Sequence, residues 1–148
     1  TYAGGIDIER PAFLNESWEY LAVDLDKADW HEQIEGSFDL ILAFDILEHL
    51  KSPYVFLESC RKKLTKSSGQ LVITTPNSLS WERYMRPSTW SGVQDPQHKV
   101  LFTRYTLQFL LRKLGFTDFT IKAPMRSLNF LGPLQPQIGG QLFAVVHH

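Results

Sequence analysis

Apolar residues along the chain fall into short runs that predict the strands of a buried sheet. Residues 38–44 (FDLILAF) are nearly all apolar, and residues 70–75 (QLVITT) form a second run of similar length. Continuous runs of this kind are typical of strands that are covered on both faces of a parallel sheet, so we expect both segments to be buried. Shorter strands are predicted at residues 5–8, 20–23, 119–121 and 141–146.

Two other segments carry the periodicity and the end signals of helices. Ser52 is a predicted N-cap and Pro53 occupies the first helical position, which proline favours. The second helix begins after an N-cap at Thr103 and ends near Gly115, a residue suited to a C-cap. A shorter helix is predicted to open at Pro11. The apolar stripes of the two longer helices are Phe56, Leu57, Cys60 and Leu64, and Leu107, Leu110, Leu111 and Leu114.

The order of these elements predicts the fold class. Alternating strands and helices that end in a late pair of strands indicate an α/β doubly wound, mostly parallel sheet with an antiparallel C-terminal strand pair. The length of 148 residues suits a single domain over residues 1–148. Residues 78–97 show no strong period, and long loops of this kind usually cover or bind a ligand, so we expect a lid or substrate loop there.

Composition and charge exclude several classes of partner. The formal net charge is -1, so bulk charge gives no reason to expect a nucleic-acid partner. No apolar run approaches the roughly 20 residues that span a bilayer, so no membrane partner is expected. The single cysteine, Cys60, excludes an intrachain disulfide and fits a reducing, cytoplasmic location.

Three motifs are informative through their order and spacing. They are FDLILAFDILEHL at residues 38–50, LVITTPN at residues 71–77 and HKVLFTRYTLQFLLRKLGF at residues 98–116. Together they resemble the class I S-adenosylmethionine-dependent methyltransferases, particularly small-molecule methyltransferases with a Leu-Glu-His signature. The resemblance implies S-adenosylmethionine as the methyl donor and S-adenosylhomocysteine as the product. It also implies a small-molecule or saccharide acceptor, with O-methylation favoured.

The resemblance assigns cofactor residues to the carboxyl ends of the strands, where open α/β sheets bind ligands. Asp7 matches the acid that binds the ribose hydroxyls, and Asp24 matches the acid that accepts from the adenine amino group. A carboxylate suits both tasks because it accepts charge-assisted hydrogen bonds. Each acid could equally be a turn residue. The cofactor set implied by the resemblance is Asp7, Ile8, Asp24, Leu25, Phe44 and Asp45.

Two histidines are the catalytic candidates, His98 and His49. A histidine at position 98 could act as a general base toward a substrate hydroxyl, or it could hold the lid to the body of the fold. Asp45-x-x-Glu48-His49 with His98 also resembles the metal-binding pattern of plant small-RNA methyltransferases and some ubiquinone-pathway O-methyltransferases, which carry Glu at the position of Asp45. The Leu-Glu-His triplet also occurs in relatives that bind no metal, so the sequence favours S-adenosylmethionine alone and leaves a divalent metal open.

One part of the family pattern is missing. None of the nine glycines forms the Gly-x-Gly of the loop that follows the family's first strand. That strand lies in the middle of the family's sheet, so its absence predicts two unpaired strand edges. We expect a fragment of a longer chain rather than a rearranged fold or a sheet that pairs with another chain, and the oligomeric state stays open. The alternative function is a degenerate, non-catalytic module that acts by protein interaction.

Overall fold

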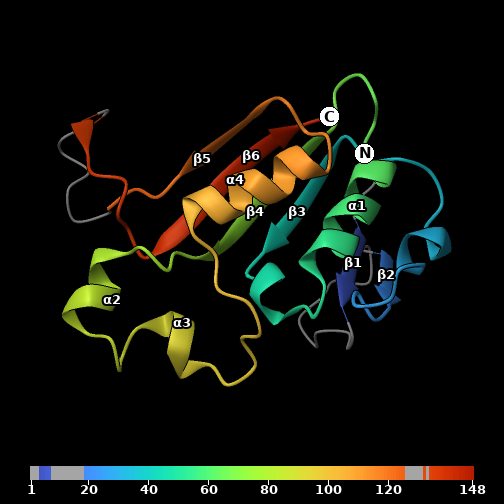
Figure 1. Cartoon of the computed structure of the whole chain (residues 1–148). Coiled ribbons are helices and arrows are strands. Elements are labelled where there is room, and N and C mark those ends of the chain that lie inside the picture. The colour runs from blue at the N-terminus through green and yellow to red at the C-terminus, as the bar shows by residue number, and fades with distance from the viewer. Residues whose placement is uncertain (1–3, 8–18, 126–131, 133) are drawn as a thin grey trace.

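The computed structural model describes residues 4–7, 19–125, 132 and 134–148 (Figure 1). Its strands form a two-stranded parallel sheet, β1-β2, and a four-stranded sheet in the order β3-β4-β6-β5. In the larger sheet β3 and β4 are parallel, while β6 is antiparallel to both β4 and β5. The expected α/β sheet with an antiparallel C-terminal pair is therefore confirmed. The strands are β1 (Gly4–Asp7), β2 (Glu19–Ala22), β3 (Leu40–Phe44), β4 (Gln70–Pro76), β5 (Phe119–Lys122) and β6 (Gln141–His147).

The strand ladder is interrupted between β1 and β3. Within the described ranges β3 pairs only with β4, and β1 pairs only with β2. The outer edge of β3 therefore presents backbone donors and acceptors that no described strand uses. Among the described strands the sheet is therefore divided into two separately paired parts.

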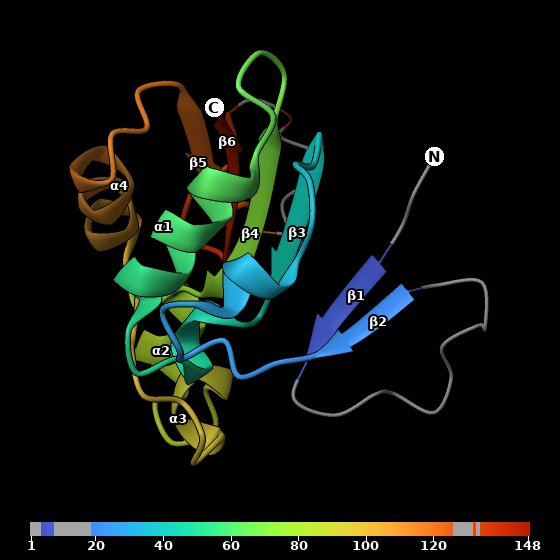
Figure 2. The ribbon, with the colours of Figure 1, turned by 90° about the vertical axis from the view of Figure 1, so that its right-hand side faces the viewer.

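Helices α1 (Pro53–Lys63) and α4 (Arg104–Lys113) lie on the same side of the four-stranded sheet (Figure 2). Both predicted helices are confirmed, with Pro53 opening the first and Gly115 (φ +83°) following the second. Thr103 caps α4 in a reciprocal capping box with Thr106, whereas the Ser52 side chain caps no backbone N–H. The helices and the sheet bury one core, which includes Leu57, Cys60, Leu71, Ile73, Leu107, Leu111, Leu142 and Ala144.

The opposite face of β3 departs from the sequence prediction. Ala43 is fully buried, but Leu40, Leu42 and Phe44 are 51%, 53% and 50% exposed. Alternate side chains of a strand point to opposite faces, and in the described part of the chain α1 and α4 cover only one of them. The expectation that residues 38–44 are covered on both faces is therefore wrong for this structure. Phe143 of β6 is likewise 42% exposed.

Short helices complete the described fold. They are η1 (Trp30–Gln33), η2 (Leu47–His49), α2 (Trp81–Met85) and α3 (Ser91–Gln94). Trp30 of η1 stacks on Phe56 of α1 with ring centroids 5.7 Å apart, which joins this segment to the core. The helix predicted at Pro11 lies outside the described residues. Among the helices described here, none is both long and apolar enough to cross a membrane.

Candidate active site

The turn after β3 begins the candidate site. Asp45 has a φ of +51°, a left-handed conformation that is uncommon for a residue other than glycine. Its backbone N–H donates to Thr74 O at 3.0 Å. Its Oδ1 accepts from Thr74 Oγ1 at 3.1 Å and from Gln141 Nε2 at 2.7 Å. Strands β4 and β6 thus hold the turn in place, and the chain continues directly into η2.

Glu48 of η2 is a buried carboxylate with an incomplete set of partners. It is 1% exposed, and its Oε2 accepts from Thr75 Oγ1 at 2.9 Å. Its Oε1 is buried without a hydrogen-bond partner among the described residues. Burial raises the pKa of the Glu48 carboxyl above its ordinary value, and the nearby Asp45 charge adds to this effect, while hydrogen bonds from backbone and from Thr75 oppose it. Glu48 therefore offers an unused acceptor beside the sheet end.

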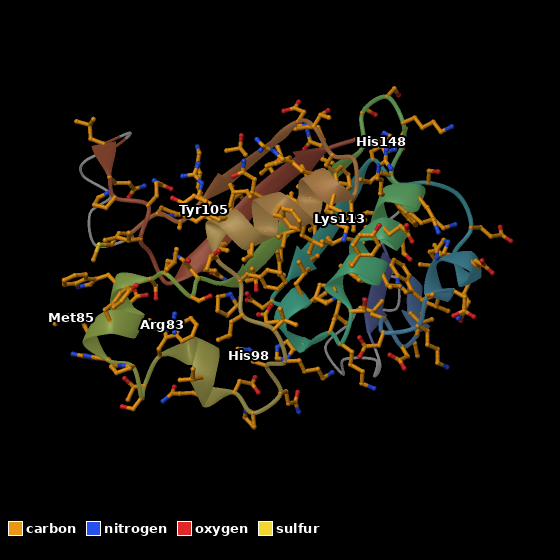
Figure 3. All side chains as sticks on the ribbon, viewed as in Figure 1. Arg83, Met85, His98, Tyr105, Lys113 and His148 are labelled. Carbon is orange, nitrogen blue, oxygen red and sulfur yellow. The ribbon has the colours of Figure 1, made fainter. Side chains whose placement is uncertain are left out.

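His49 and His98 meet at this buried carboxylate. Their rings lie edge to face with centroids 4.7 Å apart, although 49 positions separate them in the sequence. His98 lies on the segment that leaves α3 (Figure 3). Its Nδ1 is 3.1 Å from the carbonyl oxygen of Gly92. A carbonyl can only accept, so Nδ1 carries the proton and Nε2 of the neutral ring keeps its lone pair. Asp95 Oδ2 lies 3.8 Å from that Nε2, close enough to stabilise a protonated ring.

A cleft of about 1000 Å³ opens beside these residues. It lies at the carboxyl ends of β3 and β4, the edge where open α/β sheets bind ligands. From the turn after β3 it is lined by Asp45, Glu48 and His49, and from residues 82–98 by Glu82, Asp95 and His98. The start of β6 contributes Gly140, Gln141 and Phe143.

Residues 78–97, the predicted lid, are held both by contacts within the segment and by bonds to the rest of the fold, such as Trp81 N to Ile138 O at 2.9 Å. The Ser80 side chain caps α2 by accepting from Arg83 N at 3.2 Å. Trp90 is 3% exposed and packs on Gly92, where a side-chain carbon would lie only 2.0 Å from the indole ring. This packing fixes the position of the Gly92 carbonyl that His98 contacts. Trp90 is therefore buried within residues 78–97, whereas Tyr84 is 67% exposed and does not line the cleft.

The predicted cofactor residues divide into those the structure places and those it leaves open. Asp7 lies opposite Ala22 in the parallel β1-β2 pair, so the strand ends that lead to Asp7 and Asp24 are neighbours. Only the backbone of Asp7 is described, and Ile8 lies outside the described residues. Asp24 is exposed, and its Oδ1 accepts from Asp26 N at 3.0 Å, the turn contact that was the alternative explanation for this residue.

The other three predicted cofactor residues, Leu25, Phe44 and Asp45, differ in their positions relative to the cleft. Asp45 lines the cleft, and its predicted place near the transferred methyl group stays a prediction. Phe44 does not line it and lies on the exposed face of β3. The Leu25 side chain packs against the core, and the predicted role of its backbone amide stays a prediction. Sequence reasoning missed Glu82, Asp95 and Gln141, because nothing in their own segments shows that the fold brings them together.

The residues of the cluster fit a divalent cation. Glu48, His49 and His98 each offer one ligand atom, and these atoms lie within 4.8 Å of one another. Glu48 Oε1 and His49 Nδ1 are buried without partners in the described part of the chain. Carboxylate oxygen and imidazole nitrogen are ligands for ions such as Mn²⁺. The geometry thus permits the metal that the sequence left open.

Comparison with known proteins identifies the family. The family described as the methyltransferase domain matches residues 3–121, so the chain belongs to that family. No curated protein matches the chain.

Solved structures share the fold across nearly the whole chain. A SAM-dependent methyltransferase from Archaeoglobus fulgidus is 19% identical with a TM-score of 0.73, covering 98% of this chain and 75% of that one. A methyltransferase of the same description from Mesorhizobium loti is 18% identical with a TM-score of 0.66, covering 99% and 80%. The plantazolicin methyltransferase BamL, solved with S-adenosylhomocysteine and a triazolic desmethylPZN analogue, is 11% identical with a TM-score of 0.67, covering 99% and 67%.

The family makes the chain a methyltransferase domain, and its fold is that of solved SAM-dependent methyltransferases. The narrower assignment to the Leu-Glu-His group stays a prediction.

Proposed function

We propose that this methyltransferase transfers the methyl group to a hydroxyl oxygen of a small-molecule or saccharide acceptor, with His98 as the general base. The observation that carries the proposal is the hydrogen bond between His98 Nδ1 and the Gly92 carbonyl. It leaves Nε2 as the basic atom of a histidine that lines the cleft.

The cofactor would extend into the cleft from the carboxyl ends of β1 and β2, the strands that come before Asp45 in the sequence. Asp7, Ile8, Asp24 and Leu25 remain the proposed contacts for its adenosine part, with Asp45 nearer the methionine part. What supports this is the parallel register of β1 and β2, which places the ends of both strands at one edge. When bound there, S-adenosylmethionine supplies an electrophilic methyl group.

The residues of this chain would then do three things. The cleft walls hold the acceptor hydroxyl in line with the methyl carbon, which replaces a bimolecular encounter by a positioned one. As the new carbon–oxygen bond forms and the carbon–sulfur bond breaks, His98 Nε2 takes the hydroxyl proton. Asp95, 3.8 Å away, stabilises the imidazolium that results. His49, edge-on to the His98 ring, fixes the ring's position and is the second catalytic candidate.

Replacing the proposed base tests this function. His98→Gln removes the basic nitrogen, and we expect the rate of methyl transfer to fall about 100-fold or more, the usual range for a lost general base. The affinity for S-adenosylhomocysteine, measured by calorimetry, should be unchanged. His148→Gln is the matched control, because His148 is an exposed histidine outside the cleft. Equal rates in the His98→Gln variant and the wild type would contradict the base assignment.

The cluster geometry also supports a metal at Glu48, His49 and His98 as a second candidate role. A bound divalent cation would act there as a Lewis acid toward an acceptor oxygen. Titrating Mn²⁺ into protein stripped with a chelator separates the two roles. Saturable binding that Glu48→Gln abolishes would favour the metal, while full methyl transfer in excess chelator would favour His98 as a free base.

A further inference from the structure

The carboxylates that line the cleft are not balanced by lysine or arginine among the described residues. Its described lining includes four carboxylates, on Asp45, Glu48, Glu82 and Asp95, and no lysine or arginine. Glu48 is 1% exposed, and its Oε1 is buried without a partner from the described residues. An unmet acceptor inside an acidic cleft favours a ligand that donates hydrogen bonds or carries positive charge, and it disfavours an anion.

Glu82 is the acidic residue that α2 contributes to the lining of the cleft. It lies in the first turn of α2, and its carboxylate lies against the backbone of Gly140 at the start of β6. A side-chain carbon at Gly140 would be 2.2 Å from Glu82 Oε2, so the glycine leaves the room that the carboxylate occupies. No ion pair from the described part of the chain engages Glu82, in contrast to Asp95, which faces His98.

Apolar side chains complete the lining of the cleft. Pro76, Pro124, Met125 and Phe143 all border the cleft. They offer contact area for a ring or a short carbon skeleton, and the carboxylates offer hydrogen-bond acceptors. The cleft thus has a basic nitrogen at His98, an apolar wall and a carboxylate at Glu82.

We propose that the acceptor carries a protonated amine in addition to its hydroxyl, and that Glu82 recognises this amine. The inference rests on the proposed function, because it assigns the hydroxyl to His98 and the ammonium group to Glu82. The ammonium donates a charge-assisted hydrogen bond to the Glu82 carboxylate, and an acceptor that bears a carboxylate or phosphate is repelled by the same surface. The substrate class is therefore an amine that also bears a hydroxyl, such as an amino alcohol, an alkylamine with a phenol ring or an amino sugar.

Two sets of matched compounds test this charge preference. One is tyramine, para-ethylphenol and para-hydroxyphenylpropionate, and the other is glucosamine, glucose and glucuronate. Each set holds a cationic, a neutral and an anionic member of similar shape. Calorimetry with the full chain at neutral pH should show that the cationic member binds about fivefold more tightly than the neutral one in at least one set, with the anionic member weakest.

Variants at position 82 connect that preference to the residue. Glu82→Gln should abolish the difference between the cationic and neutral members, and Glu82→Asp should keep its direction. Glu58→Gln is the matched control, since Glu58 is a partly exposed helix glutamate that pairs with Lys62 outside the cleft. The proposal is overturned if no cation is preferred in either set, or if Glu82→Gln leaves the preference intact.

The same titrations distinguish this inference from the proposed function. S-adenosylhomocysteine is titrated first, and its failure to bind would argue against the methyltransferase proposal for this chain. The matched sets are then titrated both with and without it, so the charge preference of the cleft is measured either way. Glu82→Gln should weaken only acceptor binding, whereas His98→Gln should lower only the rate.

Discussion

Replacing Glu48 by glutamine offers a direct test of how the site is held. Wild-type Glu48 is 1% exposed and has one side-chain hydrogen bond, from Thr75 Oγ1 at 2.9 Å. In the Glu48→Gln variant the side-chain carbonyl can still accept from Thr75, while the unpartnered, charged oxygen is replaced by a neutral amide nitrogen. The substitution therefore removes a buried charge and keeps the shape of the side chain.

The structure sets the size and sign of the effect. A buried polar group that lacks a partner costs about 1–3 kcal/mol, and more when it is charged. Burial raises the pKa of Glu48 above its ordinary value of 4.5, so the wild type loses stability as pH rises from that value through the raised pKa of the folded state. Glutamine places an unpartnered amide N–H where the wild type has an unpartnered oxygen, so the substitution relieves only the cost of the charge. We expect Glu48→Gln to be about 1 kcal/mol more stable than the wild type in mild alkali. The difference should narrow toward acid, where the native carboxyl is also neutral.

Thermal unfolding at a series of pH values, with a chelator present, measures this directly. Each kcal/mol should raise the Tm by about 2–4 °C for a domain of this size. Glu35→Gln is the control, because Glu35 is exposed and its loss should change the Tm little at any pH. The reasoning is refuted if Glu48→Gln is the less stable protein in alkali, or if its Tm follows pH in parallel with that of the wild type.

Two further substitutions address the cofactor contact and the helix cap. Asp24→Asn keeps the oxygen that accepts from Asp26 N but removes the charge, so we expect S-adenosylhomocysteine to bind about tenfold more weakly by calorimetry. The control variant Asp29→Asn should bind it with the affinity of the wild type. Equal affinities in all three proteins would show that Asp24 is only a turn residue. Thr103→Ala removes the capping box of α4 and should lower the free energy of unfolding, measured by urea denaturation, by about 1 kcal/mol. Ser52→Ala is the control, because the Ser52 side chain caps no backbone N–H, and it should leave that free energy nearly unchanged.

Local sequence signals were sufficient for the helices that carry the core. Thr103 marks the start of α4 and Gly115 its end because capping depends on side chains and backbone freedom within a few residues. The leucine spacing identified its buried face, and Leu107 and Leu111 are fully buried. Such signals concern neighbours in the chain, so they do not depend on the rest of the fold.

The exposed face of β3 shows where the same kind of reasoning failed. An apolar run indicates that residues 38–44 form a strand, but it does not say which layers lie on either side. In the described structure α1 and α4 cover one face, and Leu42 on the other face is 53% exposed. Burial of a strand is set by its neighbours in space, which the run itself does not contain.

The sequence by itself determined the order of strands and helices, the ends of α1 and α4, and the pair of histidines worth examining. The tertiary structure decided which partners those histidines have. It brought His98 to His49, turned its Nδ1 toward Gly92, and placed Gln141 on Asp45 across 96 positions. It also assembled Glu82 and Gly140 at one cleft. Contacts between distant segments arise only when strands pair and helices pack, so no local pattern could have specified them.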